Sequence, residues 1–146
     1  MSQPTQVDPR GLRVVAGITA VVLTAVLAIP SEPVRIVLLA VQVVVFAIAA
    51  LIGLQKSPYA IFFATVVRPR IGPPAELEDG RPPRFAQVVG LAFTTVALVA
   101  LLAGATTGAL VATAFALVAA LLNAAVGLCL GCELYLALRR LSPAGA

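Results

Sequence analysis

The sequence predicts an all-α, polytopic membrane protein with four transmembrane helices arranged as two tandem helical hairpins. Two observations support this fold class. Hydrophobic residues make up 61% of the 146 residues, whereas charged residues make up only 11%, and soluble domains carry roughly 25% charged residues. The apolar residues also gather in blocks of about twenty, which is the length that a helix needs to cross a bilayer.

The turns and the charged stretches between the apolar blocks set the order of the elements. We expect a single membrane domain over residues 1–146, with a loop at residues 55–84 and spans at residues 13–29, 34–54, 85–103 and 109–138. The first block lacks an A-x-A-type cleavage site, so we expect it to remain as a transmembrane helix. The fourth block is longer than a crossing requires, so one of its ends should project past the membrane or lie along its surface.

The basic residues predict how the protein is oriented. Only Arg35 falls on one side of the predicted bundle, and nine of the ten basic residues fall on the other: Arg10, Arg13, Lys56, Arg68, Arg70, Arg81, Arg84, Arg139 and Arg140. Positive flanks remain in the cytoplasm. We therefore expect a multi-pass protein of the inner (plasma) membrane with cytoplasmic N- and C-termini. This role accounts for the net charge of +4, and a nucleic-acid partner is not expected because the aromatic and polar residues of such a surface are missing.

The two predicted hairpins begin with the same spacing of charged residues. Asp8-Pro-Arg10-Gly-Leu-Arg13 opens the first, and Asp79-Gly-Arg81-Pro-Pro-Arg84 opens the second, 71 positions later. Both copies enter the membrane from the same side, so the pattern favours a parallel duplication. A chance likeness between two basic juxtamembrane stretches is the alternative.

The residues best suited to chemistry lie near the end of the fourth block, in Gly127-Leu-Cys129-Leu-Gly131-Cys132-Glu133. On a continuous helix, residues three apart share a face, so both thiols should point the same way at the cytoplasmic interface. Three interpretations stay open. The pair is a redox or sulfur-handling dithiol tuned by Glu133, or a soft-metal site that a dimer would have to complete, or a packing contact. A permanent disulfide is not expected in a reducing cytosol, and neither a metal nor a cofactor is assigned.

Other polar residues suggest contacts rather than chemistry. Gln42 and Asn123 fall within apolar blocks, where amides usually bond to a neighbouring helix; lining a substrate path is the alternative. No ionisable residue lies at the centre of a span, so we do not expect a proton-coupled transporter or an ion pump. The loop arginines either anchor the loop to anionic lipid or form a docking platform for a cytosolic protein: Arg68, Arg70, Arg81 and Arg84.

Four motifs together carry a family resemblance. They are Val7-Asp-Pro-Arg-Gly, Val67-Arg-Pro-Arg-Ile-Gly-Pro-Pro-Ala-Glu-Leu-Glu-Asp, Pro82-Pro-Arg-Phe-Ala-Gln87 and Cys129-Leu-Gly-Cys-Glu-Leu-Tyr135. This combination resembles an actinobacterial membrane family catalogued as domain of unknown function 4395. The resemblance implies an association with thioredoxin-like and rhodanese-type sulfurtransferase proteins, and this association favours the dithiol interpretation. It does not make the protein an enzyme.

We therefore predict an accessory to cytosolic thiol-redox or sulfur-transfer metabolism, embedded in the lipid bilayer. Cys129 and Cys132 would be the working pair, Glu133 would modulate it, and a thioredoxin-like or sulfurtransferase protein would be the partner. The alternative is a small transport or scaffold protein, acting as a homo-oligomer, in which the cysteines only pack.

Overall fold

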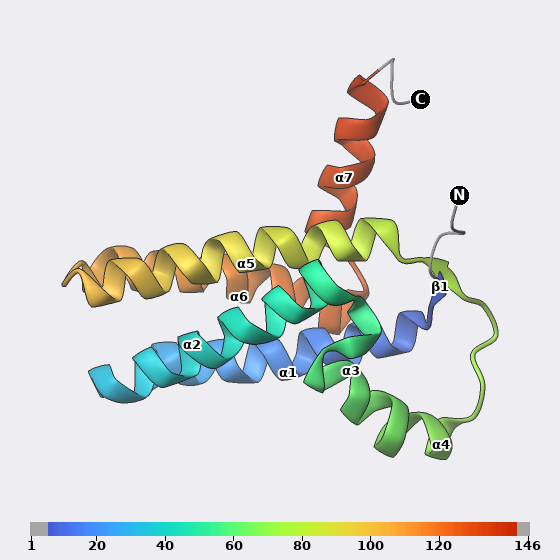
Figure 1. Ribbon diagram of the computed structural model, residues 1–146, viewed down its shortest axis with the longest axis horizontal. Helices are drawn as coiled ribbons and strands as arrows, with labels where there is room; N and C mark the ends of the chain where they lie inside the picture. Colours follow the sequence, from blue (N-terminus) through green and yellow to red (C-terminus); the bar gives the residue numbers. More distant parts are fainter. Residues whose placement is uncertain (1–5, 143–146) are drawn as a thin grey trace.

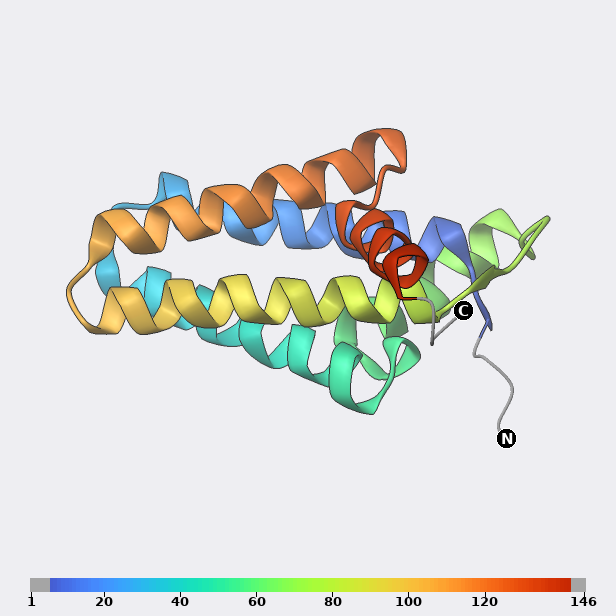
Figure 2. The same ribbon diagram turned by 90° about the horizontal axis from the view of Figure 1, so that it is seen from above.

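A computed structural model describes residues 6–142, and its architecture is a bundle of four long helices that run side by side (Figures 1 and 2). Each of the four is long and apolar enough to cross a membrane, α2 together with the turn that follows it. The predicted all-α fold with two tandem hairpins is therefore confirmed. The long helices are α1 (Pro9–Ala28), α2 (Glu32–Ala47), α5 (Arg81–Leu102) and α6 (Thr106–Val126).

The shorter elements gather at one end of the bundle, which we call the loop end; the turn end carries the two hairpin connections at residues 29–31 and 103–105 (Figure 1). The predicted loop contains a helical stretch over residues 58–71. The shorter elements are β1 (Gln6–Val7), η1 (Ile48–Ile52), η2 (Leu54–Lys56), α3 (Pro58–Phe62), η3 (Phe63–Val67), α4 (Arg68–Ile71), β2 (Glu78–Asp79) and α7 (Leu130–Leu141).

The fourth predicted span, residues 109–138, is not one helix. It divides at Gly127, where the backbone is left-handed with φ of 73°, a conformation that glycine adopts without steric cost. The chain then turns, and α7 leaves the direction of the bundle (Figure 1). The prediction of a continuous helix was wrong. It rested on hydropathy, and hydropathy does not change at the break. The length beyond one crossing belongs to α7.

Each helix of one hairpin packs along a helix of the other hairpin. Helix α1 lies along α6, and α5 lies along α2 (Figure 2). The buried core sits toward the turn end, where side chains from all four helices meet: Leu23, Val26, Leu39, Ala97, Leu101 and Ala109. The apolar core thus holds the four helices together at the turn end, whereas polar groups gather at the loop end.

The charged repeat predicted from the sequence has the same local structure in both halves. Asp8 accepts the backbone N–H of Arg10 at 3.0 Å, and Asp79 accepts that of Arg81 at 2.9 Å. Each arginine side chain also bonds back to its aspartate, which holds the pKa of both carboxyl groups below the usual value. Strands β1 and β2 pair antiparallel with Val7 opposite Glu78. These two residues are 71 positions apart, so they occupy the same position in the two repeats. Equivalent residues that face each other across an antiparallel pair are related by a local two-fold axis, which therefore lies between the halves.

The last arginine of each repeat joins the halves. The Arg13 guanidinium donates to the carbonyls of Ala124 at 3.1 Å and Ala125 at 2.9 Å, at the end of α6. Arg84 donates in the same way to Ala50 at 2.7 Å and Leu51 at 3.1 Å, in η1. Carbonyls at a helix end have no partner within the helix, and leaving them unsatisfied in an apolar setting is costly. These bonds therefore fasten each hairpin to the other.

Replacing Arg84 by methionine should destabilise the bundle, because the carbonyls of Ala50 and Leu51 lose a charged donor. We expect a loss of about 1–3 kcal/mol, seen as a lower midpoint of thermal unfolding by circular dichroism in detergent micelles. Arg70→Met is the matched control, since Arg70 is exposed and, among residues 6–142, its side chain donates only to Val66 of its own helical segment. Equal midpoints for the two variants would show that the Arg84 contact does not hold the hairpins together.

Candidate functional site

The two cysteines lie where α7 begins. Cys129 is the residue before the first turn, with an extended backbone, and its Sγ accepts the N–H of Cys132 at 3.1 Å. The Cα atoms are 5.1 Å apart, and the two sulfurs form a disulfide. The expectation that both residues lie on one continuous helix was wrong, because Cys129 caps the helix instead of belonging to it. The same cap geometry brings the sulfurs together in the oxidised form, whereas the argument from a reducing cytosol predicted free thiols.

The first half of the chain has a matching cap at the corresponding place. Ser57 precedes α3, and its Oγ accepts the N–H of Ala60 at 3.2 Å. A side chain that accepts the third N–H of a helix is a standard N-terminal cap. In the second half, Cys129 takes this role and Cys132 supplies the N–H. In each half a side chain therefore caps a helix that follows the second long helix, and in the second half the capping atom is a sulfur.

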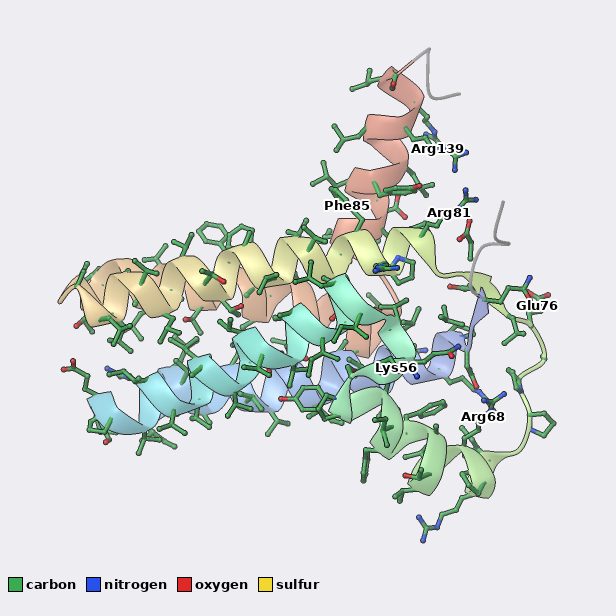
Figure 3. The ribbon with its side chains drawn as sticks, in the orientation of Figure 1. Lys56, Arg68, Glu76, Arg81, Phe85 and Arg139 are labelled. Atoms are coloured by element: carbon green, nitrogen blue, oxygen red, sulfur yellow. A yellow bond between two sulfur atoms is a disulfide. The ribbon has the colours of Figure 1, made fainter. Side chains whose placement is uncertain are left out.

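Helix α7 is held against α5 immediately beside the disulfide. A Cβ on Gly131 would lie 2.6 Å from the Cα of Ala86, so only glycine permits this approach. The rings of Phe85 and Tyr135 are 5.7 Å apart and extend the contact (Figure 3). The close approach and the aromatic pair together fix the start of α7, and with it the cysteine pair.

Glu133 follows Cys132 directly and stands exposed in the first turn of α7. A carboxylate in this position interacts favourably with the positive end of the helix dipole. The sequence placed Glu133 next to the pair, and the structure keeps it there. Within residues 6–142, no group of three or more potential ligands that could hold a metal ion is found.

A cavity of about 550 Å³ opens beside the disulfide and enters the bundle between α1, α5 and α6. Both cysteines and Glu133 are among the residues that line it. Sequence reasoning missed this cavity and one of its polar residues, Gln87. Other polar groups that line it come from distant parts of the chain: Arg13, Thr19, Glu78 and Asn123.

The two intramembrane amides have different surroundings. Gln42 is fully buried, donates to the Thr19 hydroxyl at 3.4 Å and accepts the Tyr59 hydroxyl at 3.0 Å. Burial raises the pKa of Tyr59, and its protonated hydroxyl is the donor in this bond. The predicted bond from Gln42 to a neighbouring helix is thus confirmed. Asn123 instead lines the cavity.

The loop arginines have unequal environments. Arg81 bonds to Asp79 at 2.6 Å, and Arg84 is engaged with the end of η1. Arg68 and Arg70 stand exposed on α4. Figure 3 shows Arg81 near Arg139 of α7, whereas Arg68 lies away from them on the opposite flank of the loop end. The structure therefore does not gather the four arginines around the cysteine pair.

Comparison with known proteins identifies the family. A model described as a domain of unknown function, DUF4395, matches residues 7–140. The chain belongs to this family. The match covers the repeat, the loop and the cysteine pair, so the membership of domain of unknown function 4395 that the sequence motifs predicted is confirmed. No curated protein and no solved structure matches the chain.

In this DUF4395 protein, a side chain at position 131 should push α7 away from α5. Gly131→Ala would meet the backbone of Ala86, so we expect a lower unfolding midpoint and faster reduction of the disulfide by dithiothreitol. Gly108→Ala is the matched control, because a Cβ there meets nothing within 4 Å. Both quantities can be followed in micelles by circular dichroism and by counting alkylated thiols. Identical behaviour of the two variants would contradict a tight α5–α7 contact.

Proposed function

We propose that this protein is a multi-pass component of the inner (plasma) membrane whose loop end faces the cytoplasm. The nine basic residues at that end support this orientation, since positive flanks are retained in the cytoplasm. Arg35 is the exception at the turn end; it donates to the carbonyl of Val26 at 3.0 Å and so caps α1. On this orientation the cysteine pair meets the cytosol.

Labelling in intact cells tests the orientation. A membrane-impermeant maleimide, added after reduction with a permeant reductant, should miss Cys129 and Cys132 in intact cells and modify them in inverted vesicles. A cysteine introduced at Ser31, at the turn end of a chain whose native cysteines are serine, is the control and should show the reverse pattern. Modification of the native pair from outside would overturn the orientation.

We further propose that the pair exchanges its disulfide with a cytosolic dithiol protein, as an accessory to thiol-redox or sulfur-transfer metabolism. The single observation that carries this proposal is the position of Cys129 at the N-terminus of α7, with its Sγ accepting a backbone N–H. The positive end of a helix stabilises a thiolate. Cys129 is therefore suited to both directions of exchange. Its thiolate leaves readily when the disulfide is attacked, and the same thiolate can attack a disulfide of a partner.

The exchange balances without a further reagent. A thiolate of the partner attacks one sulfur of the Cys129–Cys132 disulfide, the S–S bond breaks, and the other cysteine leaves as a thiolate. The second thiol of the partner then resolves the mixed disulfide. The partner is oxidised to a disulfide by two electrons, and this pair becomes a dithiol. Glu133, exposed beside Cys132, is positioned to pass a proton to or from the pair.

A thioredoxin-like or sulfurtransferase protein is the partner that this chemistry suits. Its docking surface would include the arginines of the loop end. Arg68 and Arg70 are exposed there, whereas the bonds of Arg81 to Asp79 and of Arg84 to η1 give those residues a structural task as well. The same arginines can also bind anionic lipid headgroups.

One observation favours a second function, that of a scaffold. The close approach of Gly131 to Ala86 means that the start of α7 is tightly packed against α5. In a scaffold, the disulfide would only stabilise this contact, and we call such a disulfide a clamp. A clamp would resist exchange, and its removal would lower stability. A redox pair would exchange readily and leave stability nearly unchanged.

Equilibration with glutathione separates the two functions. The full-length protein in micelles is incubated with graded ratios of reduced to oxidised glutathione, quenched with an alkylating agent and scored for free thiols. We expect both cysteines to titrate together, and reduced thioredoxin to speed the reduction by about tenfold or more over glutathione. The double variant Cys129→Ser with Cys132→Ser should unfold at nearly the wild-type midpoint. A pair that stays oxidised throughout, with a double variant of clearly lower midpoint, would identify a clamp.

A further inference from the structure

The cavity beside the disulfide is larger than thiol exchange at a surface requires. Its deep end is marked by Phe93, twelve positions into α5, and by Phe115, eleven positions before the end of α6. At 1.5 Å per residue, these positions lie about 16–18 Å from the loop end. The volume of about 550 Å³ falls in the range of small-molecule sites. The cavity therefore connects the disulfide to the middle of the bundle.

Small side chains on α6 create the space. Ala116, Ala119, Ala120 and Asn123 line the cavity, and their spacing places them on one face of the helix. Helices α1 and α5 line it at the same helical spacing, with Val15, Ala16 and Thr19 on one and Ala86, Val89, Gly90 and Phe93 on the other. The faces of these three helices form most of the cavity wall, and Phe46 of α2 and the segment from Gly127 into α7 complete it.

The first half of the duplicated fold has larger side chains where α6 has alanines. Arg13 caps Ala124 and Arg84 caps Ala50, and this correspondence aligns α6 with α2 at an offset of 74 positions, three more than in the charged repeat. In that alignment, Ala116, Ala119 and Ala120 correspond to larger side chains of α2, all buried: Gln42, Val45 and Phe46. The ring of Phe46 packs against Gly90 of α5 and itself lines the cavity. The small side chains that border the cavity on α6 are therefore not repeated on α2.

The lining suits a neutral, lipid-soluble ligand with an acceptor group. Phe115 is 64% exposed and Phe93 is 39% exposed, so the deep end reaches the surface that a bilayer would cover. Near the disulfide the lining turns polar, and within residues 6–142 neither Gln87 nor Asn123 uses its amide in a hydrogen bond. Glu78 and Glu133 line the same end together with one arginine, Arg13, whose guanidinium donates to the carbonyls of α6. The two carboxylates outnumber this cation and disfavour an anionic headgroup.

We infer that this cavity binds a lipid-soluble quinone that reoxidises the Cys129–Cys132 pair. The inference rests on the proposed function, since it supplies the oxidant that returns the dithiol to a disulfide. Two S–H bonds are broken and one S–S bond is formed, while two electrons and two protons pass to the quinone oxygens and give a hydroquinone. The amides of Gln87 and Asn123 donate to the quinone carbonyls, and the isoprenoid tail leaves past Phe93 and Phe115.

The test uses decylubiquinone, whose fully substituted ring cannot alkylate thiols. The pre-reduced, full-length protein in nanodiscs is mixed with this quinone without oxygen, and hydroquinone formation is followed together with the loss of free thiols. We expect one hydroquinone per disulfide formed. Ala119→Phe, which fills the cavity, should slow the reaction by about tenfold or more. Val118→Phe is the matched control, because Val118 is 53% exposed on the same helix and does not line the cavity; it should react at the wild-type rate.

Parallel measurement of glutathione exchange separates this inference from the proposed function. Ala119→Phe should exchange with glutathione at the wild-type rate, which also shows that the variant is folded. Normal exchange without any quinone reduction by the wild-type protein would overturn the quinone site and leave the exchange function standing. Equal rates for Ala119→Phe and Val118→Phe would also overturn it, as would a phospholipid acyl chain retained in the cavity and not displaced by decylubiquinone. Loss of glutathione exchange in the wild-type protein would instead remove the proposed function.

Discussion

A helix that ends beside a bilayer leaves its last carbonyls without partners, and the way this protein satisfies them organises the rest of the structure. Arginines from other segments supply the missing donors. Arg13 reaches the end of α6, Arg84 reaches η1, and Arg35 reaches the end of α1. Arg13 and Arg84 each belong to the opposite half from the carbonyls that they cap. The bonds that satisfy the last carbonyls of one hairpin are consequently the bonds that hold it to the other hairpin. The bond made by Arg13 lies next to the break at Gly127, after which the disulfide and α7 follow.

The charged repeat shows how far sequence reasoning reaches in this fold. The spacing of Asp8, Arg10 and Arg13 predicted a duplication, and the apolar blocks predicted the four long helices. The structure adds the physical reason for the spacing. The aspartate accepts a backbone N–H at the start of the helix, the next arginine pairs with its carboxylate, and the last arginine donates to carbonyls of the other half. What the sequence did not reveal was the break at Gly127. A single glycine flanked by valine and leucine does not change hydropathy, and the left-handed backbone depends on how the ends of α6 and α7 are packed.

Sequence reasoning drew attention to the cysteine pair but did not predict its surroundings. The expectation that Cys129 and Cys132 lie close together holds, although for a different reason, since it assumed one helix and free thiols. Gln42 was correctly expected to bond to another helix. The capping role of Cys129 could not be foreseen while the segment was taken as one helix. The cavity was also beyond reach, because its walls come from three helices that are distant in sequence. A signal does exist: the alanines of α6 correspond to bulky residues of α2, but this comparison requires the alignment that the two capping arginines provide.

The two halves differ in what surrounds their capping residues. In the first half, Ser57 caps a helix and Phe63 lies so close to Gly11 that a Cβ there would be 2.8 Å from its ring. In the second half, Cys129 caps a helix beside an open cavity. The cap bond from the Cys132 N–H to the Cys129 sulfur does not require the S–S bond, because a thiolate accepts a hydrogen bond as well as a hydroxyl does. Helix α7 can therefore keep its start in both redox states, which would allow the pair to change its oxidation state without unfolding the element that positions it.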